Sequence, residues 1–207
     1  MKTIKVCADP FPPYQYVKED GSMAGRDYDV VCGALAAAGY DVEVTIADWS
    51  VVISAFENQE CDALFQVQDT PARREAYRFS EKLRDAVTDV VKLQGNGLAI
   101  AAYDDLKNYR LGLIAGFANG DDIDSLPEGC KRYYNGTQEI LDALYAGEID
   151  AAVCDRGVRE YLTDFDEKIV PVEALTYKRP LYVMFHDAGI RDDFNSGLLK
   201  LAEKTEA

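Results

Sequence analysis

The chain has 207 residues, of which 48% are hydrophobic, so it can form one large domain or two small lobes. Its net charge of −15 argues against binding to nucleic acids or to anionic membrane surfaces, because both need basic patches. No apolar run approaches the roughly 20 residues that a membrane-spanning helix needs.

Strand and helix patterns alternate along the first third of the chain. Gly39 provides a helix stop, and Asp48 is expected to cap the helix that follows it. Such an alternation with short loops indicates an α/β fold with mostly parallel sheets. The predicted elements are, in chain order, strand 4–8, helix 27–38, strand 41–47, helix 49–58 and strand 61–67.

A weak internal repeat indicates a second unit that is built like the first. Residues 53–65 align without gaps on residues 141–153. In both copies a helix end is followed by Glu, one further residue, and an Asp-Ala pair that opens an apolar strand. The same order of helix, turn and strand therefore occurs twice.

Two extended segments, 88–93 and 180–185, are expected to cross between the two units, and residues 192–207 have the pattern of a C-terminal helix. The first lobe is therefore discontinuous. The predicted boundaries are 1–90 plus 179–207 for lobe 1 and 91–178 for lobe 2.

The cysteines show no spacing typical of a metal site, and we expect them to be small buried apolar residues. Their odd number allows a disulfide but leaves at least one thiol free. The chain has a single histidine, His186, which excludes a histidine-based metal site and argues against a Ser-His-Asp triad. We expect no metal and no cofactor. The five cysteines are Cys7, Cys32, Cys61, Cys130 and Cys154.

The segment 69–83 reads DTPARREAYRFSEKL, with Thr70-x-x-Arg73 followed by Phe-Ser six residues after the arginine. It resembles the signature of the family 3 extracellular solute-binding proteins, the periplasmic receptors that deliver polar amino acids to ABC transporters. In that family the arginine binds the α-carboxylate of the ligand, which implies this role for Arg73. A planar guanidinium suits the role because it can donate two parallel hydrogen bonds to a carboxylate.

Other parts of the chain extend the resemblance. The segment Asp9-Pro-Phe-Pro-Pro-Tyr14 is similar to a family segment near the ligand, and Trp49 stands where the family has an aromatic residue at a helix start. At 26–28, Arg-Asp-Tyr replaces the usual Gly-Phe-Asp order. The segment that ends in Asp155 matches the family's Gly-x-x-Asp-Ala-x-x-x-Asp, whose last residue pairs with the ligand's α-ammonium group.

The resemblance implies a two-lobed periplasmic binding protein type II fold. Each lobe would be a mixed, mostly parallel sheet flanked by helices, with the ligand cleft between the lobes. Arg73 in lobe 1 would bind the carboxylate and Asp155 in lobe 2 the ammonium group, so that the ligand favours closure. Tyr14 and Trp49 would flank the ligand's side chain. Asp9 stands where some members bind a basic side chain or the ammonium group.

Two segments depart from the family pattern. The small hydroxyl residues that usually precede Thr-x-x-Arg are replaced by residues 65–69, where the amide of Gln68 could substitute and Asp69 could compete for Arg73. In lobe 2, the hydroxyl residues usual at a helix start are replaced by residues 116–119, which include Phe117. These departures leave the identity of the ligand open.

The first hypothesis is a non-catalytic receptor for an amino acid or related small carboxylate, a monomer that acts with a membrane ABC permease. Two alternatives stay open. One is an enzyme similar to the cyclohexadienyl dehydratases, with Glu173 or Glu81 as general acid. The other is a periplasmic accessory protein of a quinoprotein dehydrogenase, which residues 6–10 resemble. The chain runs from Met1 straight into a strand pattern, which fits either a mature secreted form with an added Met or a cytosolic protein. The resemblance implies the first, a periplasmic or extracellular protein whose signal peptide has been removed.

Overall fold

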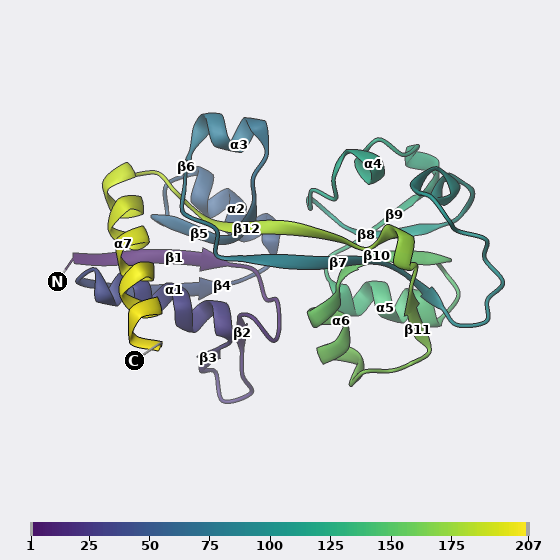
Figure 1. Ribbon diagram of the computed structural model, residues 1–207, viewed down its shortest axis with the longest axis horizontal. Coiled ribbons are helices and arrows are strands. Elements are labelled where there is room, and N and C mark those ends of the chain that lie inside the picture. Colours follow the sequence, from purple (N-terminus) through teal and green to yellow (C-terminus); the bar gives the residue numbers. More distant parts are fainter. Residues whose placement is uncertain (1, 206–207) are drawn as a thin grey trace. The chain divides into compact units, whose positions relative to one another are not determined.

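The computed structural model describes residues 2–205. Unit 1 comprises the described residues up to Asp85 and from Pro180 onward, and unit 2 is Ala86–Arg179. The chain passes between the units in the strands β7 (Arg84–Leu93) and β12 (Tyr177–Phe185), each of which begins in one unit and ends in the other (Figure 1). The predicted lobe boundaries, 1–90 plus 179–207 for lobe 1 and 91–178 for lobe 2, stay a prediction.

Unit 1 contains a sheet in the order β4-β1-β5-β12, in which β1 is parallel to β4 and β5 while β12 is antiparallel to β5. The two-residue strand β6 pairs with β12, and β2 and β3 form a separate hairpin. The strands are β1 (Lys2–Ala8), β2 (Tyr16–Val17), β3 (Met23–Ala24), β4 (Tyr40–Ile46), β5 (Ala63–Gln68) and β6 (Arg78–Phe79). The helices are α1 (Arg26–Ala37), α2 (Trp49–Glu57), α3 (Pro71–Ala76) and α7 (Ala188–Thr205).

The elements predicted for the first third of the chain all form, with ends that differ from the predictions by about two residues at most. The C-terminal helix begins at Ala188, four residues before its predicted start, and its predicted last residues, 206 and 207, lie outside the described part. Gly39 stops α1 as expected, with a positive φ of 93°. Asp48 occupies the position before α2, but its side chain accepts no capping hydrogen bond, so that prediction was wrong in detail.

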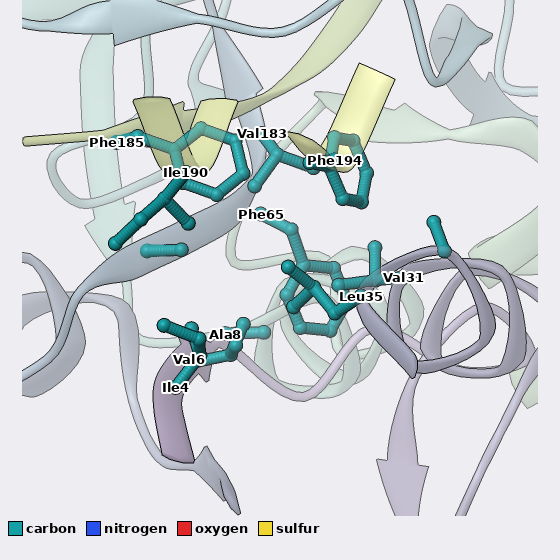
Figure 2. Close-up of a cluster of buried hydrophobic side chains, with 12 residues drawn as sticks. Ile4, Val6, Ala8, Val31, Leu35, Phe65, Val183, Phe185, Ile190 and Phe194 are labelled. Atoms are coloured by element: carbon teal, nitrogen blue, oxygen red, sulfur yellow. The ribbon is translucent and has the colours of Figure 1, made fainter. Parts of the chain in front are cut away.

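Alternating side chains place one apolar core on each face of the unit 1 sheet. Ile4, Val6 and Ala8 of β1 point to the face that α1 and α7 cover, where Figure 2 shows them gathered with Phe65 and Phe194. The intervening Cys7 points to the opposite face, toward the core under α2. Burial on both faces explains why β5 begins with three consecutive apolar residues, Ala63 to Phe65.

A β-bulge interrupts the alternation in β5. Val67 pairs with Tyr182 and Phe65 pairs with Val183, so Gln66 is the extra residue, and its φ is +65°. The parity of β5 changes there: Leu64 and Val67, three residues apart, face the same core. The bulge turns the polar side chain of Gln66 into the interior, where it is buried.

Unit 2 contains the sheet order β7-β10-β8-β9, with β11 paired to β7. β8 is parallel to β9 and β10, and β7 is antiparallel to β10 and β11. The strands are β8 (Leu111–Ile114), β9 (Lys131–Tyr134), β10 (Ala151–Asp155) and β11 (Ile169–Pro171), and the α-helices are α4 (Asp121–Asp124), α5 (Thr137–Tyr145) and α6 (Arg156–Thr163). The 3₁₀ helices are η1 (Tyr103–Asn108), η2 (Glu128–Cys130) and η3 (Glu173–Leu175).

The internal repeat is confirmed by equivalent hydrogen bonds in the two units. In unit 1, the Asp62 carboxylate accepts the Lys5 amide at 2.8 Å, and the Asp62 amide donates to the Lys5 carbonyl at 2.8 Å. In unit 2, Asp150 and Arg110 make the same two bonds, also at 2.8 Å. The repeated aspartate therefore ties the start of one strand to its parallel neighbour.

We predict that Gly197→Ala destabilises unit 1 by about 1–3 kcal/mol. A Cβ at Gly197 of α7 would lie 2.0 Å from the carbonyl oxygen of Ala34 in α1, and backbone cannot move aside locally. The matched control is Gly33→Ala, where the nearest atom is the end of the flexible Leu201 side chain at 3.2 Å. The control should be nearly neutral because alanine favours helix. Urea unfolding measures both, and equal effects would contradict the close packing of α1 on α7.

Candidate functional site

The six residues that the sequence predicts as ligand-binding in lobe 1 all follow the carboxyl ends of neighbouring strands or lie at those ends. Asp9 and Tyr14 follow β1, Trp49 follows β4, and Gln68, Thr70 and Arg73 end or follow β5. These three strands are parallel neighbours. The carboxyl edge of a parallel sheet is where α/β proteins place their ligands.

Arg73 is held by its local chain. Thr70 is the N-cap of α3, and its hydroxyl accepts the Arg73 amide at 3.3 Å. The guanidinium donates to the Gln68 carbonyl at 3.1 Å and lies 5.3 Å from the centre of the Trp49 ring. The side chain is half-buried, and burial lowers the pKa of Arg73 from its usual value. A guanidinium has five N–H donors, so these contacts leave capacity for a carboxylate.

Asp69, which the sequence suggested as a competitor for Arg73, pairs instead with Arg74. Its carboxylate accepts from Arg74 Nε at 2.7 Å. The Arg74 guanidinium also lies over the rings of Phe79 and Tyr182, at 4.9 Å and 5.1 Å from their centres. The neighbouring arginine thus neutralises Asp69 and leaves Arg73 without that competitor.

Asp9 is a buried carboxylic acid, with 6% of its surface exposed. Burial raises the pKa of Asp9 to about 7, the charge of Asp48 adds to the rise, and a backbone hydrogen bond opposes it. The fully buried Gln15 donates from its amide to the Asp9 carbonyl at 3.1 Å, which fixes the loop after β1. Asp9 can therefore gain or lose a proton near neutral pH.

A buried ion pair that the sequence analysis missed supports Tyr14. Arg84, at the start of β7, donates from Nε to Asp27 of α1 at 2.6 Å and from Nη2 to the Gln66 amide oxygen at 3.0 Å. The Gln66 amide nitrogen donates to the same Asp27 carboxylate. The Arg84 guanidinium lies 3.5 Å from the centre of the Tyr14 ring, so it covers one face of that ring.

The sequence did contain a signal for the burial of Arg84. In β7, Arg84, Ala86, Thr88 and Val90 share one parity, and all four are buried. An arginine at an inward position of a strand needs a buried partner, but strand parity alone does not identify that partner. Gln66 carried no such signal because the bulge in β5 breaks the alternation.

In unit 2 the predicted residues also follow neighbouring parallel strands. Asp155 ends β10 and is the N-cap of α6, where its Oδ1 accepts the Val158 amide at 3.1 Å. It is buried, with 6% exposed. Phe117 is half-buried in the loop after β8. Asp155 therefore combines a capping role with a position at the carboxyl edge of the sheet.

Two further residues hold the loop that carries Phe117. Arg179 donates to the Ala118 carbonyl and, at 3.2 Å, to the Thr88 hydroxyl. The Tyr177 hydroxyl donates to the Asn119 carbonyl at 2.9 Å. Burial lowers the pKa of Arg179 from its usual value. Arg179 has the same strand parity as the buried Leu181 and Val183, the signal that could have indicated it.

The single histidine contacts an aromatic ring, and the two candidate general acids lie at the surface. His186 stacks on Phe56 with ring centres 4.0 Å apart, and its Nε2 lies 2.8 Å from the Phe56 carbonyl. Glu81 and Glu173, the general acids of the enzyme alternative, are both exposed. Within residues 2–205, no group of three or more His, Cys, Asp or Glu side chains is arranged to hold a metal ion. In the same range, every helix is too short or too polar to cross a membrane.

Comparison with known proteins places the chain in context. A family model described as bacterial extracellular solute-binding proteins, family 3, matches residues 4–206. The chain is similar to the arginine-binding extracellular protein ArtP of Bacillus subtilis (strain 168), with 24% identity over 213 residues that cover 99% of this chain and 82% of ArtP. It is also similar to the L-cystine-binding protein TcyJ of Escherichia coli (strain K12), with 22% identity over 148 residues, 70% of this chain and 56% of TcyJ.

Solved structures show the same fold. The arginine-bound form of truncated ArgBP from T. maritima matches with a TM-score of 0.85 and 18% identity, over 96% of both chains. A histidine kinase sensor domain with similarity to periplasmic binding proteins matches with a TM-score of 0.87 and 21% identity, over 99% of this chain and 92% of that one. The predicted α/β periplasmic binding protein type II fold is confirmed.

We predict that Arg84→Met destabilises the protein by about 3–5 kcal/mol, because it leaves the buried Asp27 carboxylate without its cationic partner. The matched control is Arg26→Met. Arg26 lies 3.8 Å from the same carboxylate but its side chain is 70% exposed, so its loss should cost less than about 1 kcal/mol. Denaturant unfolding compares them. The double variant Asp27→Asn/Arg84→Met should recover part of the loss, and strict additivity would argue against the pair.

We predict that Asp9→Asn stabilises the ligand-free protein at pH 8 but not below about pH 4. The folded pKa of Asp9 is raised from 3.8 to about 7, so the unfolded chain releases this proton first as pH rises. Wild-type stability therefore falls between those values, by on the order of 4 kcal/mol at most. Asparagine has no proton to release. Unfolding curves of both proteins across this pH range test the prediction, and parallel pH profiles would refute it.

Proposed function

Because the chain belongs to the family 3 bacterial extracellular solute-binding proteins, we propose that it is a non-catalytic receptor that captures an amino acid. The observation that carries the proposal is the guanidinium of Arg73, half-exposed at the carboxyl edge of a parallel sheet and held over Trp49. A guanidinium in this setting supports the binding of a carboxylate, because it can donate two parallel hydrogen bonds.

Asp155 is the proposed partner for the ligand's α-ammonium group. A zwitterion needs both an anionic and a cationic partner, because a charge removed from water without one is costly. Asp155 is buried at the end of β10, and a carboxylate can accept several hydrogen bonds, so the α6 cap and an ammonium group are compatible.

Asp9, Tyr14 and Trp49 are the proposed contacts for the ligand's side chain. Tyr14 and Trp49 each contact an arginine guanidinium through one ring face, and aromatic rings of this kind suit contact with a ligand's side chain. Asp9 adds a carboxyl group that ionises near neutral pH and suits a ligand with a cationic or hydrogen-bonding side chain. ArtP, which is named as arginine-binding, supports a basic amino acid as the first ligand to test. Gln68 and Phe117 are the proposed contacts that replace the hydroxyl residues usual in the family.

The proposed partner is a membrane ABC permease, and the proposed location is outside the cytoplasmic membrane. The family supports both, since its members are described as extracellular solute-binding proteins. The receptor is proposed to act as a monomer.

The test is a thermal-shift screen with the twenty amino acids, ornithine, cystine, dicarboxylates and arogenate, followed by calorimetric titration. A ligand at about 100 times its dissociation constant adds roughly 2.7 kcal/mol of stability, which raises the melting temperature of a chain of this length by several degrees. We predict that Arg73→Ala weakens binding of the hit by roughly 100-fold or more, because the carboxylate loses its charged donors.

Arg78→Ala is the matched control. Arg78 is an exposed arginine in β6 whose guanidinium donates to the Tyr77 carbonyl, so its loss should leave affinity within a few-fold. Equal losses in the two variants would contradict the role of Arg73. An intact, cooperatively melting protein that no amino acid stabilises would overturn the receptor proposal, and turnover of arogenate would replace it with the enzyme.

A further inference from the structure

Cys7 and Cys61 lie side by side in unit 1. Cys7 is the sixth residue of β1, and Cys61 precedes β5 by two residues. Both belong to the apolar core under α2, and each is about 4% exposed. The pKa of each thiol is shifted by its interaction with the other.

The backbone already holds the two cysteine-bearing segments together. Cys7 pairs with Leu64 and Val6 with Ala63 in parallel register, and the Asp62 amide donates to the Lys5 carbonyl at 2.8 Å. A covalent link between the two sulfurs would therefore join neighbouring segments rather than pull distant ones together. That matters because disulfide geometry tolerates little displacement of the backbone.

The remaining cysteines have other surroundings among the described residues. Cys130 and Cys154 lie in two different cores of unit 2, and Cys130 contacts the Pro127 carbonyl through its sulfur. Cys32 lies in α1, where its thiol interacts with Tyr28. The sequence allowed a disulfide without indicating a pair, and the structure singles out Cys7 with Cys61.

In the folded protein the two thiols differ in pKa, because their interaction lowers the pKa of Cys7 and raises the pKa of Cys61. The exchange itself needs accessible sulfurs, and only a thiolate attacks a disulfide.

We propose that Cys7 and Cys61 form an intramolecular disulfide when the protein folds in an oxidising compartment. The oxidant is a disulfide, either a small molecule such as oxidised glutathione or a thiol–disulfide oxidoreductase. The Cys7 thiolate attacks the oxidant and expels one thiolate, which leaves a mixed disulfide. The Cys61 thiolate then attacks the Cys7 sulfur and expels the second. Two cysteine thiols lose two protons and two electrons, and the oxidant's disulfide becomes two thiols.

The compartment and the burial of the pair fit this reaction. Proteins of this family are extracellular, where disulfides form and persist. Both sulfurs are buried in the folded chain, so the exchange takes place during folding, before α2 covers them. The bond would then close the loop from Cys7 to Cys61 and lock β1, which leads directly to Asp9, onto the start of β5.

The experiment refolds the reduced, denatured protein in a glutathione redox buffer, so that burial does not limit access. The product is denatured, treated with iodoacetamide without reductant, digested and analysed by mass spectrometry. We expect a linked pair of peptides that contains Cys7 and Cys61, with alkylation of the other three cysteines. The oxidised protein should melt about 5–10 °C higher than the reduced one.

Cys7→Ala and Cys61→Ala should each abolish the linked peptides and the difference in melting temperature between oxidised and reduced protein. Cys154→Ala is the matched control, since it removes another buried cysteine but should leave both the link and the difference intact. Alkylation of all five cysteines after oxidative refolding, or a link that involves a different pair, would overturn the proposal. The outcome does not depend on any ligand, so it is separate from the test of the receptor.

Discussion

The buried ion pair between Asp27 and Arg84 is the constraint on which unit 1 most depends. A carboxylate in the interior is tolerated only with a charged partner and further hydrogen bonds, and Arg84 and Gln66 supply both. The pair ties the first turn of α1 to the start of β7 and to the bulge in β5. Because the Tyr14 carbonyl accepts the Asp27 amide at 2.9 Å, the loop after β1 is bound to the same group.

Unit 2 has a corresponding buried carboxylate with different partners. Asp89 is fully buried, accepts two hydrogen bonds from Arg156 at 2.8 Å and 2.9 Å and one from Arg159 at 3.1 Å, and also accepts the Thr176 hydroxyl. These bonds hold the start of α6 against β7. The N-cap of α6 is Asp155, so the network that stabilises the helix also positions the proposed partner for a ligand's ammonium group.

Both units thus place the candidate ligand contacts on a rigid support. The candidate ligand contacts follow parallel strands, and buried arginines fix the loops that carry them: Arg84 for Tyr14 and Arg179 for the loop with Phe117. This division of roles explains why an acidic chain keeps arginines in its interior. The proposed disulfide would extend the same support, since Cys7 lies two residues before Asp9.

The sequence by itself determined the strands and helices of the first third of the chain, the repeat, and the Thr70–Arg73 motif, because hydrophobic periodicity and turn residues act between residues close in the chain. Tertiary structure alone decided the partners of buried polar groups. Asp27 and Arg84 are 57 residues apart in sequence. The bulge at Gln66 breaks the periodicity that would have revealed the burial of Gln66 beside them. Cys7 and Cys61 share one core for the same reason: partner choice depends on distances between elements, which no local pattern encodes.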